Sequence, residues 1–197
     1  KYNIEYGSLD GSFNRKTLIK VEANPEQGFN YPYFLYLPGS INLNKNSYMI
    51  VEPNNTGTSS DDLAVHEKRA YREVDNNWLA EALAAPILVP VFPRPRTQPK
   101  GVSQGGYAYT HALCRQTLKI DPSEDLYRVD LQLIEMIDNA RNLLSQKGLN
   151  LHEKVFMHGY SASGNYLPRF SQIHPERVKA IAAGGLNGMP NLPLSEY

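Results

Sequence analysis

Short apolar runs recur along the chain, and each one is followed by turn or helix signals. The segment 16–23 alternates apolar and polar residues, which predicts a half-buried strand. More continuous apolar runs, flanked by Gly, Pro, Asn or Ser, predict buried strands. These runs cover 33–38, 47–53, 87–92, 154–159 and 178–185.

Between these runs, longer segments have helical periodicity. The first begins after Ser59 or Ser60, either of which can cap a helix, and ends near Ala84, before Pro86. A second helix is predicted from Asp121 as the N-cap to Gly148 as the stop. Its apolar stripe comprises Leu126, Val129, Leu133, Ile137, Ala140 and Leu144.

A third helix, over 162–174, contains Pro168, which should kink it. Strands that alternate with helices predict a single α/β domain over 1–197, a three-layer sandwich around a mostly parallel sheet. Ligands bind such sheets beyond the carboxyl ends of the strands. The candidate site should therefore involve the loops 53–62, 93–122, 159–163 and 184–190.

Composition excludes several classes of function. Lys plus Arg and Asp plus Glu both number 20, so the basic excess of a nucleic-acid binder is absent. No apolar run is long enough to span a membrane, and the compartment stays open between cytoplasmic and exported. The lone Cys114 reads as an inert small residue, and neither metal-ligand spacing nor a dinucleotide or phosphate loop is present. No metal or cofactor is therefore expected.

The stretch "GYSASG", residues 159–164, lies between a predicted strand and a predicted helix. It nearly matches the nucleophile elbow G-x-S-x-G, in which a serine sits on a sharp turn between small neighbours. Gly159 fits that motif, while Ser163 stands where the second glycine is usual and Gly164 follows it. The pattern favours Ser161 as a nucleophile over an ordinary capping serine, with Ser163 a weaker candidate.

The turn "HGYSASGN" and the segment "HPERVKAIAAGG" resemble the α/β-hydrolase superfamily, and most closely the polyhydroxybutyrate-depolymerase-like esterases. The resemblance implies an oxyanion hole made by the backbone amides of Ala162 and of Asn54 or Asn55. It also implies an acid and then a histidine after the serine. The residues after Ser161 contain no Asp and one histidine, His174, which should close its helix far from Ser161. We therefore expect the chain to be C-terminally incomplete, without the last strands of the sheet.

Other histidines precede Ser161 in the chain. His111, in the long loop 93–122, is a candidate substrate contact, and the alternative is a base paired with Asp61 or Asp62. His66 is expected on an exposed helix face, whereas His158, on the strand that enters the turn, is expected to be packed or hydrogen-bonded.

Aromatic and basic residues complete the candidate site. Tyr109 and Tyr160 are candidate substrate contacts, and Tyr107 with Tyr109 could form an aromatic lid. Arg94, Arg96 and Lys100 suit either a solvated loop or an anionic substrate.

These observations predict a serine hydrolase that cleaves small-molecule or polymer esters through an acyl-enzyme, or its N-terminal portion. The alternative is a non-catalytic binding protein that has a hydrolase fold without a complete triad. An acyltransferase or peptidase would use the same serine. A sheet that ends at its last predicted strand exposes an apolar edge, so we also expect copies of the chain to associate.

Overall fold

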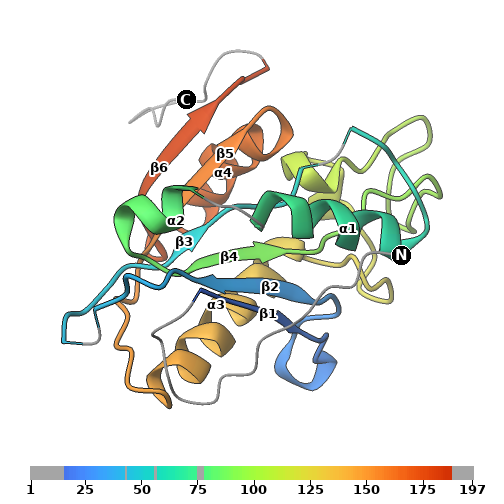
Figure 1. Ribbon diagram of the computed structural model, residues 1–197. Helices are drawn as coiled ribbons and strands as arrows, with labels where there is room; N and C mark the ends of the chain where they lie inside the picture. The colour runs from blue at the N-terminus through green and yellow to red at the C-terminus, as the bar shows by residue number, and fades with distance from the viewer. Residues whose placement is uncertain (1–15, 43, 56, 75–77, 188–197) are drawn as a thin grey trace.

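A six-stranded sheet runs through the computed structural model, which describes residues 16–42, 44–55, 57–74 and 78–187 (Figure 1). The strands lie in the order β1-β2-β4-β3-β5-β6, so β1 and β6 form its edges. Their bounds are β1 Thr17–Val21, β2 Tyr33–Leu37, β3 Ile50–Val51, β4 Ile87–Pro90, β5 Val155–Tyr160 and β6 Val178–Gly184. All six lie within the predicted strand segments, apart from one added residue at the end of β5.

The direction of pairing changes at β2. This strand is antiparallel to both β1 and β4, while the pairs β4–β3, β3–β5 and β5–β6 are parallel. The sheet is therefore mixed, with a parallel half that ends in β5 and β6. The carboxyl ends of β3 and β5 are neighbours, which brings the loop after Val51 beside the turn after Tyr160.

Helices cover both faces of the sheet and confirm the three-layer sandwich (Figure 1). Alternate side chains of β2 point to opposite faces: Tyr33, Leu35 and Leu37 join one core, and Phe34 and Tyr36 join the other. The first core packs against α3 and α4, the second against α1 and α2. The α-helix bounds are α1 Leu63–Val74, α2 Trp78–Leu83, α3 Val129–Ser145 and α4 Ala162–Ile173.

Two helix starts differ from the sequence predictions. Helix α1 begins at Leu63, because the Asp62 carboxylate, rather than Ser59 or Ser60, accepts the N–H of Ala64. Helix α3 begins at Val129, well after the predicted cap Asp121, because Arg128 adopts a left-handed backbone with φ of 46°. Asp121 instead caps a local turn by accepting the N–H of Ser123.

The loop 93–122 has little regular structure, as predicted, but is tied to its surroundings. It contains two short 3-10 helices, η2 Thr110–Ala112 and η3 Thr117–Lys119; a third, η1 Pro25–Gln27, precedes β2. The Asp61 carboxylate accepts the backbone N–H groups of Arg96 and Thr97, at 2.8 and 3.0 Å. These bonds fix the loop against the start of α1.

At the other edge, β6 exposes much of its surface. Beside it lies an apolar groove of about 200 Å³, lined by residues such as Leu83, Phe156 and Ile181. No helix in the described part of the chain is both long and apolar enough to cross a membrane. Association through this edge stays a prediction.

Candidate active site

Ser161 stands on a strained turn between β5 and α4. Its backbone has φ of 62° and ψ of −115°, a conformation that glycine tolerates and other residues rarely adopt. The side chain is exposed, and the residue directly precedes the first turn of α4. A sharp turn between strand and helix thus exposes Ser161 to solvent, as in the nucleophile elbow motif.

The second serine of the motif has a structural task. The Ser163 hydroxyl accepts the N–H of Tyr160 and donates to the carbonyl oxygen of the same residue, both at 3.0 Å. Ser163 is buried, so its oxygen faces the turn and not solvent. Of the two candidates, Ser161 alone has the exposure that a nucleophile needs.

The small residues around Ser161 are required by close packing. A Cβ on Gly159 would stand 2.9 Å from the carbonyl carbon of Ser163. A Cβ on Gly164 would collide with the carbonyl oxygen of Gly184, at the end of β6. Strand and helix therefore approach so closely that only glycine fits, which is the physical basis of the motif's spacing.

A pocket of about 330 Å³ opens beside Ser161. One wall is formed by Ser161, the N-cap of α4, and by Asn165 and Arg169 of the helix, which recur every four residues and so share one helix face. The opposite walls include Tyr109 and Cys114 from the long loop and Asn187 after β6. Sequence reasoning found Tyr109 but missed Asn165, Arg169 and Asn187, although the four-residue spacing from Ser161 was a usable signal.

Two of these residues support the pocket walls. The Asn165 side chain donates to the Ser161 carbonyl at 2.7 Å and accepts the N–H of Asn187 at 3.2 Å. The Arg169 guanidinium donates to the carbonyl oxygen of Ala112 and so joins α4 to the loop. Cys114, expected from sequence to be an inert small residue, lies half-buried in this pocket wall.

Asn54 lies buried under the end of β4. Its side chain donates to the Phe92 carbonyl at 2.8 Å and accepts the Phe92 N–H at 3.2 Å. These two bonds join the loop after β3 to the segment that follows β4. The amide side chain is thereby occupied, so any donor that Asn54 offers to a substrate must be its backbone N–H.

The Asn55 backbone N–H, proposed from sequence as an oxyanion donor, points to a buried carboxylate. It lies 2.8 and 3.0 Å from the two carboxylate oxygens of Glu73 in α1. The Asn55 side chain donates to the carbonyl oxygen of Tyr160 at 2.8 Å. With its N–H engaged by Glu73, Asn55 cannot offer that group to an oxyanion in this conformation.

His111 is buried, with 1% of its surface exposed. Its Nε2 lies 2.7 Å from the Phe92 carbonyl and donates to it. Burial lowers the pKa of His111 to about 3, so the ring stays neutral at neutral pH. Asp61 binds backbone amides and Asp62 caps α1, so neither is the acid partner considered from sequence. The buried His111 thus joins the loop 93–122 to Phe92, just after β4. Its contact with a substrate remains a prediction.

His66 is buried, contrary to the exposed position expected from sequence. Its Nε2 lies 2.9 Å from the Ser60 carbonyl, which draws the ring under the loop before α1. His158 lies on β5 with its Nδ1 3.4 Å from Glu52, but its side chain is 40% exposed, so the packed position expected from sequence is not found.

The aromatic residues of the loop are clamped by an arginine. The Arg94 guanidinium lies 4.1 Å from the ring centre of Tyr109 and donates to the Tyr107 hydroxyl at 3.0 Å. Arg94 thus packs within the loop, with its guanidinium group over the rings of both Tyr107 and Tyr109. Tyr160 is 68% exposed and its ring covers Gly184 and Gly185 beside the Ser161 pocket.

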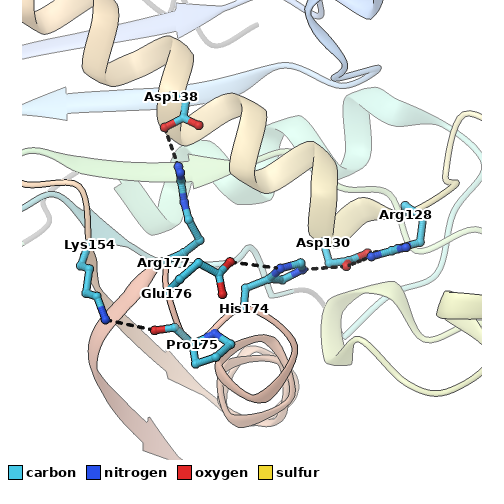
Figure 2. Close-up of polar contacts among 8 residues, drawn as sticks. All are labelled: Arg128, Asp130, Asp138, Lys154, His174, Pro175, Glu176 and Arg177. Atoms are coloured by element: carbon cyan, nitrogen blue, oxygen red, sulfur yellow. Dashed lines mark hydrogen bonds and ion pairs between the residues drawn. The ribbon is translucent and has the colours of Figure 1, made fainter.

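An acid and a histidine form a bonded pair at the far end of α4 (Figure 2). His174 Nε2 is 2.9 Å from the buried carboxylate of Asp130, which also receives a bidentate pair of bonds from Arg128. Burial would raise the pKa of Asp130, but the bonds from Arg128 and His174 hold that pKa below its usual value. This pair joins the end of α4 to the start of α3. It is roughly 20 Å from Ser161 at 1.5 Å per helical residue, as expected for His174.

Three solved structures share this architecture at low sequence identity. They are acetyl xylan esterase from Aspergillus awamori (TM-score 0.52, 17% identity), poly(aspartic acid) hydrolase-1 from Sphingomonas sp. KT-1 (0.51, 16%) and S-formylglutathione hydrolase from Agrobacterium tumefaciens (0.50, 15%). The matches cover 85%, 92% and 89% of this chain, respectively. The chain has a fold of the α/β-hydrolase type.

The chain spans only 52%, 61% and 60% of the lengths of those three structures. Neither a protein-family model nor a curated protein matches the sequence significantly. The likeness therefore establishes the fold, and the chemistry must be argued from the site itself.

Proposed function

We propose that the chain is a serine hydrolase of carboxylic esters, or a portion of one, that acts through an acyl-enzyme on Ser161. The observation that carries this proposal is the strained backbone of Ser161, whose hydroxyl is exposed at the start of α4. Non-glycine residues keep such conformations where the surrounding structure holds them, and such positions cluster at functional sites. The esterases among the similar structures support the same reaction class.

In this mechanism the Ser161 hydroxyl oxygen attacks the ester carbonyl carbon, and its proton passes to a general base. The N-terminus of α4 stabilises the negative charge that develops on the carbonyl oxygen. The Ala162 N–H is one donor, and the backbone N–H of Asn54 is the second candidate. The protonated base then returns its proton to the departing alcohol, and water releases the acid.

The general base is the unassigned part of this mechanism. Within the described ranges, no histidine lines the Ser161 pocket. His111 is neutral and bonded to Phe92, and His174 is bonded to Asp130 at the other end of α4. None of the described residues is assigned as the base or as its acid partner. A polyhydroxybutyrate-depolymerase-like specificity is the narrower form of the proposal, and it rests on the sequence resemblance.

The pocket also gives the second candidate function a specific basis. A binding protein with a hydrolase fold needs the pocket but no base, and the described part of the pocket contains none. Such a protein would keep ligands near Asn165 and Arg169 without reacting with them.

Labelling with a fluorophosphonate probe, read by intact mass, tests the proposal. Ser161→Ala removes the nucleophile, and Ser171→Ala on the same helix is the matched control. A single adduct that Ser161→Ala abolishes and Ser171→Ala retains supports an activated serine. No adduct in a folded protein would contradict hydrolysis by this chain and favour the binding protein. Turnover of nitrophenyl esters of increasing acyl length then defines the ester class.

A further inference from the structure

The peptide unit that joins Tyr160 to Ser161 is held from both sides. Its N–H, which belongs to Ser161, donates to the Gly184 carbonyl at 2.9 Å, from the side of β6. Its carbonyl oxygen, which belongs to Tyr160, accepts the Asn55 side-chain N–H at 2.8 Å, from the side of β3. The orientation of this peptide plane sets φ of Ser161, so both bonds bear directly on the strained turn.

Asn55 is itself held by a group on another layer of the fold. Its backbone N–H donates to the Glu73 carboxylate in α1, with both oxygens within 3.0 Å. The sequence of contacts therefore runs from Glu73 through Asn55 to the carbonyl oxygen of Tyr160. It crosses from the helix layer, over the end of β3, to the turn of Ser161.

A local backbone strain persists only when its neighbours over-determine it. Ser163 closes the turn from within, by its two bonds to Tyr160, while Asn55 reaches the same carbonyl from outside the turn. Without Asn55, the Tyr160 carbonyl loses its link to the β3 loop. We propose, on the basis of the function proposed above, that Asn55 and Glu73 are positioning residues that hold Ser161 in its attacking orientation.

The charges around Glu73 make this arrangement sensitive to pH. Burial, with a smaller contribution from nearby Glu52, raises the pKa of Glu73 to about 8, against the opposing effects of the Asn55 N–H and Arg69. Glu52 in turn faces His158 of β5, 3.4 Å away. Near pH 8 the group changes from a neutral acid to a carboxylate, which accepts the Asn55 N–H more strongly. Positioning of Ser161 should tighten over the same range.

The test compares the wild-type chain with Glu73→Gln, which keeps the shape of the side chain and cannot ionise. Glu67→Gln is the matched control, because Glu67 lies on the same helix and pairs with Lys20 instead. Backbone amide resonances of Asn55 and Ser161 are followed by NMR from pH 6 to 10, and fluorophosphonate labelling rates are measured over the same range.

In the wild type and in Glu67→Gln, both amides should titrate together with a midpoint near 8. In Glu73→Gln this titration should vanish. The ratio of wild-type to Glu73→Gln labelling rates should rise about tenfold between low and high pH, the scale of one stronger hydrogen bond. A ratio of labelling rates that does not change with pH would overturn the proposal. So would a Ser161 amide resonance that does not shift as Glu73 titrates.

The two proposals fail in different ways. If the wild type is not labelled at any pH while the amides titrate together, the serine hydrolase proposal fails for this chain and the positioning contacts stand. If labelling is efficient and its pH profile is the same in Glu73→Gln, the hydrolase stands and the positioning role fails. Thermal unfolding of each variant confirms that the comparison is made on folded protein.

Discussion

The carbonyl oxygen of Gly184 occupies the space that a side chain on Gly164 would need. Gly164 lies in the first turn of α4 and Gly184 ends β6, so helix and strand touch backbone to backbone beside Ser161. The last described strand is thus part of the support of the turn.

Gly164→Ala should therefore destabilise the protein. The new methyl group forces α4 away from β6, which we expect to lower the free energy of unfolding by about 2–4 kcal/mol. Gly57→Ala is the control, because a Cβ there meets no atom within 4 Å. Chemical denaturation measures both variants, and equal stability of the two would contradict the close contact.

The strain at Ser161 predicts an unusual order of stability among its variants. Ser161→Gly relieves the positive φ, while Ser161→Ala retains it. Strained backbones of this kind cost about 1–3 kcal/mol, and a glycine relieves that strain. Glycine also makes the unfolded chain more flexible, which cancels part of the gain. The free energy of unfolding of Ser161→Gly should therefore exceed that of Ser161→Ala by roughly 1 kcal/mol. Denaturant midpoints measure the difference. A glycine variant less stable than the alanine variant would show that the turn is not strained.

The buried carboxylate of Asp130 should stabilise the junction of α3 and α4. Asp130→Asn leaves Arg128 and His174 without their charge partner, so we expect a loss of about 3 kcal/mol at pH 7. Because the pKa of Asp130 is lowered in the folded state, its contribution is present above the ordinary aspartate range and is lost as pH falls below it. The stability difference between wild type and Asp130→Asn should then shrink in acid.

Asp138→Asn is the control for that measurement. Asp138 pairs with Arg177 (Figure 2). It also pairs with Arg141, and all three side chains are partly exposed, where an ion pair contributes about 1 kcal/mol or less. An equal loss in the two variants would argue that burial of Asp130 adds nothing.

Glu73→Gln should stabilise the folded state in alkaline solution. The pKa of Glu73 is raised to about 8, so the folded chain holds its proton more tightly than the unfolded chain. This contribution is fully present below the unfolded pKa and is lost as pH rises through 8. Relative to wild type, the variant should gain roughly 2–4 kcal/mol between pH 5 and pH 9. Thermal unfolding across this range measures the gain, and a pH-independent difference would contradict the raised pKa.

Periodicity was sufficient to predict the strands and their alternation with helices, but it predicted one helix up to Ala84 where the structure has α1 and α2. It also predicted α4 and the turn at Ser161, because their signals are local: an apolar run, small residues, then a helical stripe. The start of α3 was missed because Pro122 and Glu124 favour a helix locally, whereas Arg128 adopts a positive φ while it bonds to buried Asp130. A conformation that depends on a folded ion pair leaves no trace in the sequence pattern.

The interior of the site was less predictable for the same reason. Glu73 meets Asn55 only after distant segments have packed, and away from the site the same holds for Asp130 and His174. His66 carries a helical pattern typical of a solvated face, yet the Ser60 carbonyl draws it inside. Sequence spacing could indicate which residues share a helix face, as with Ser161, Asn165 and Arg169, but not which partners the loops bring to them.

The position of β3 in the sheet has a consequence for the order of folding. This two-residue strand lies at the centre, where Ile50 pairs with Ile87 on one side and with Phe156 on the other. Its second partner is synthesised long after its first, so a ribosome-bound chain carries an unpaired parallel edge until β5 has emerged. Contacts so distant in sequence make folding slow and leave apolar strands open to intermolecular pairing. The centre of this sheet is thus completed by the same strand that leads into the turn of Ser161, so the sheet centre and that turn depend on the same late pairing.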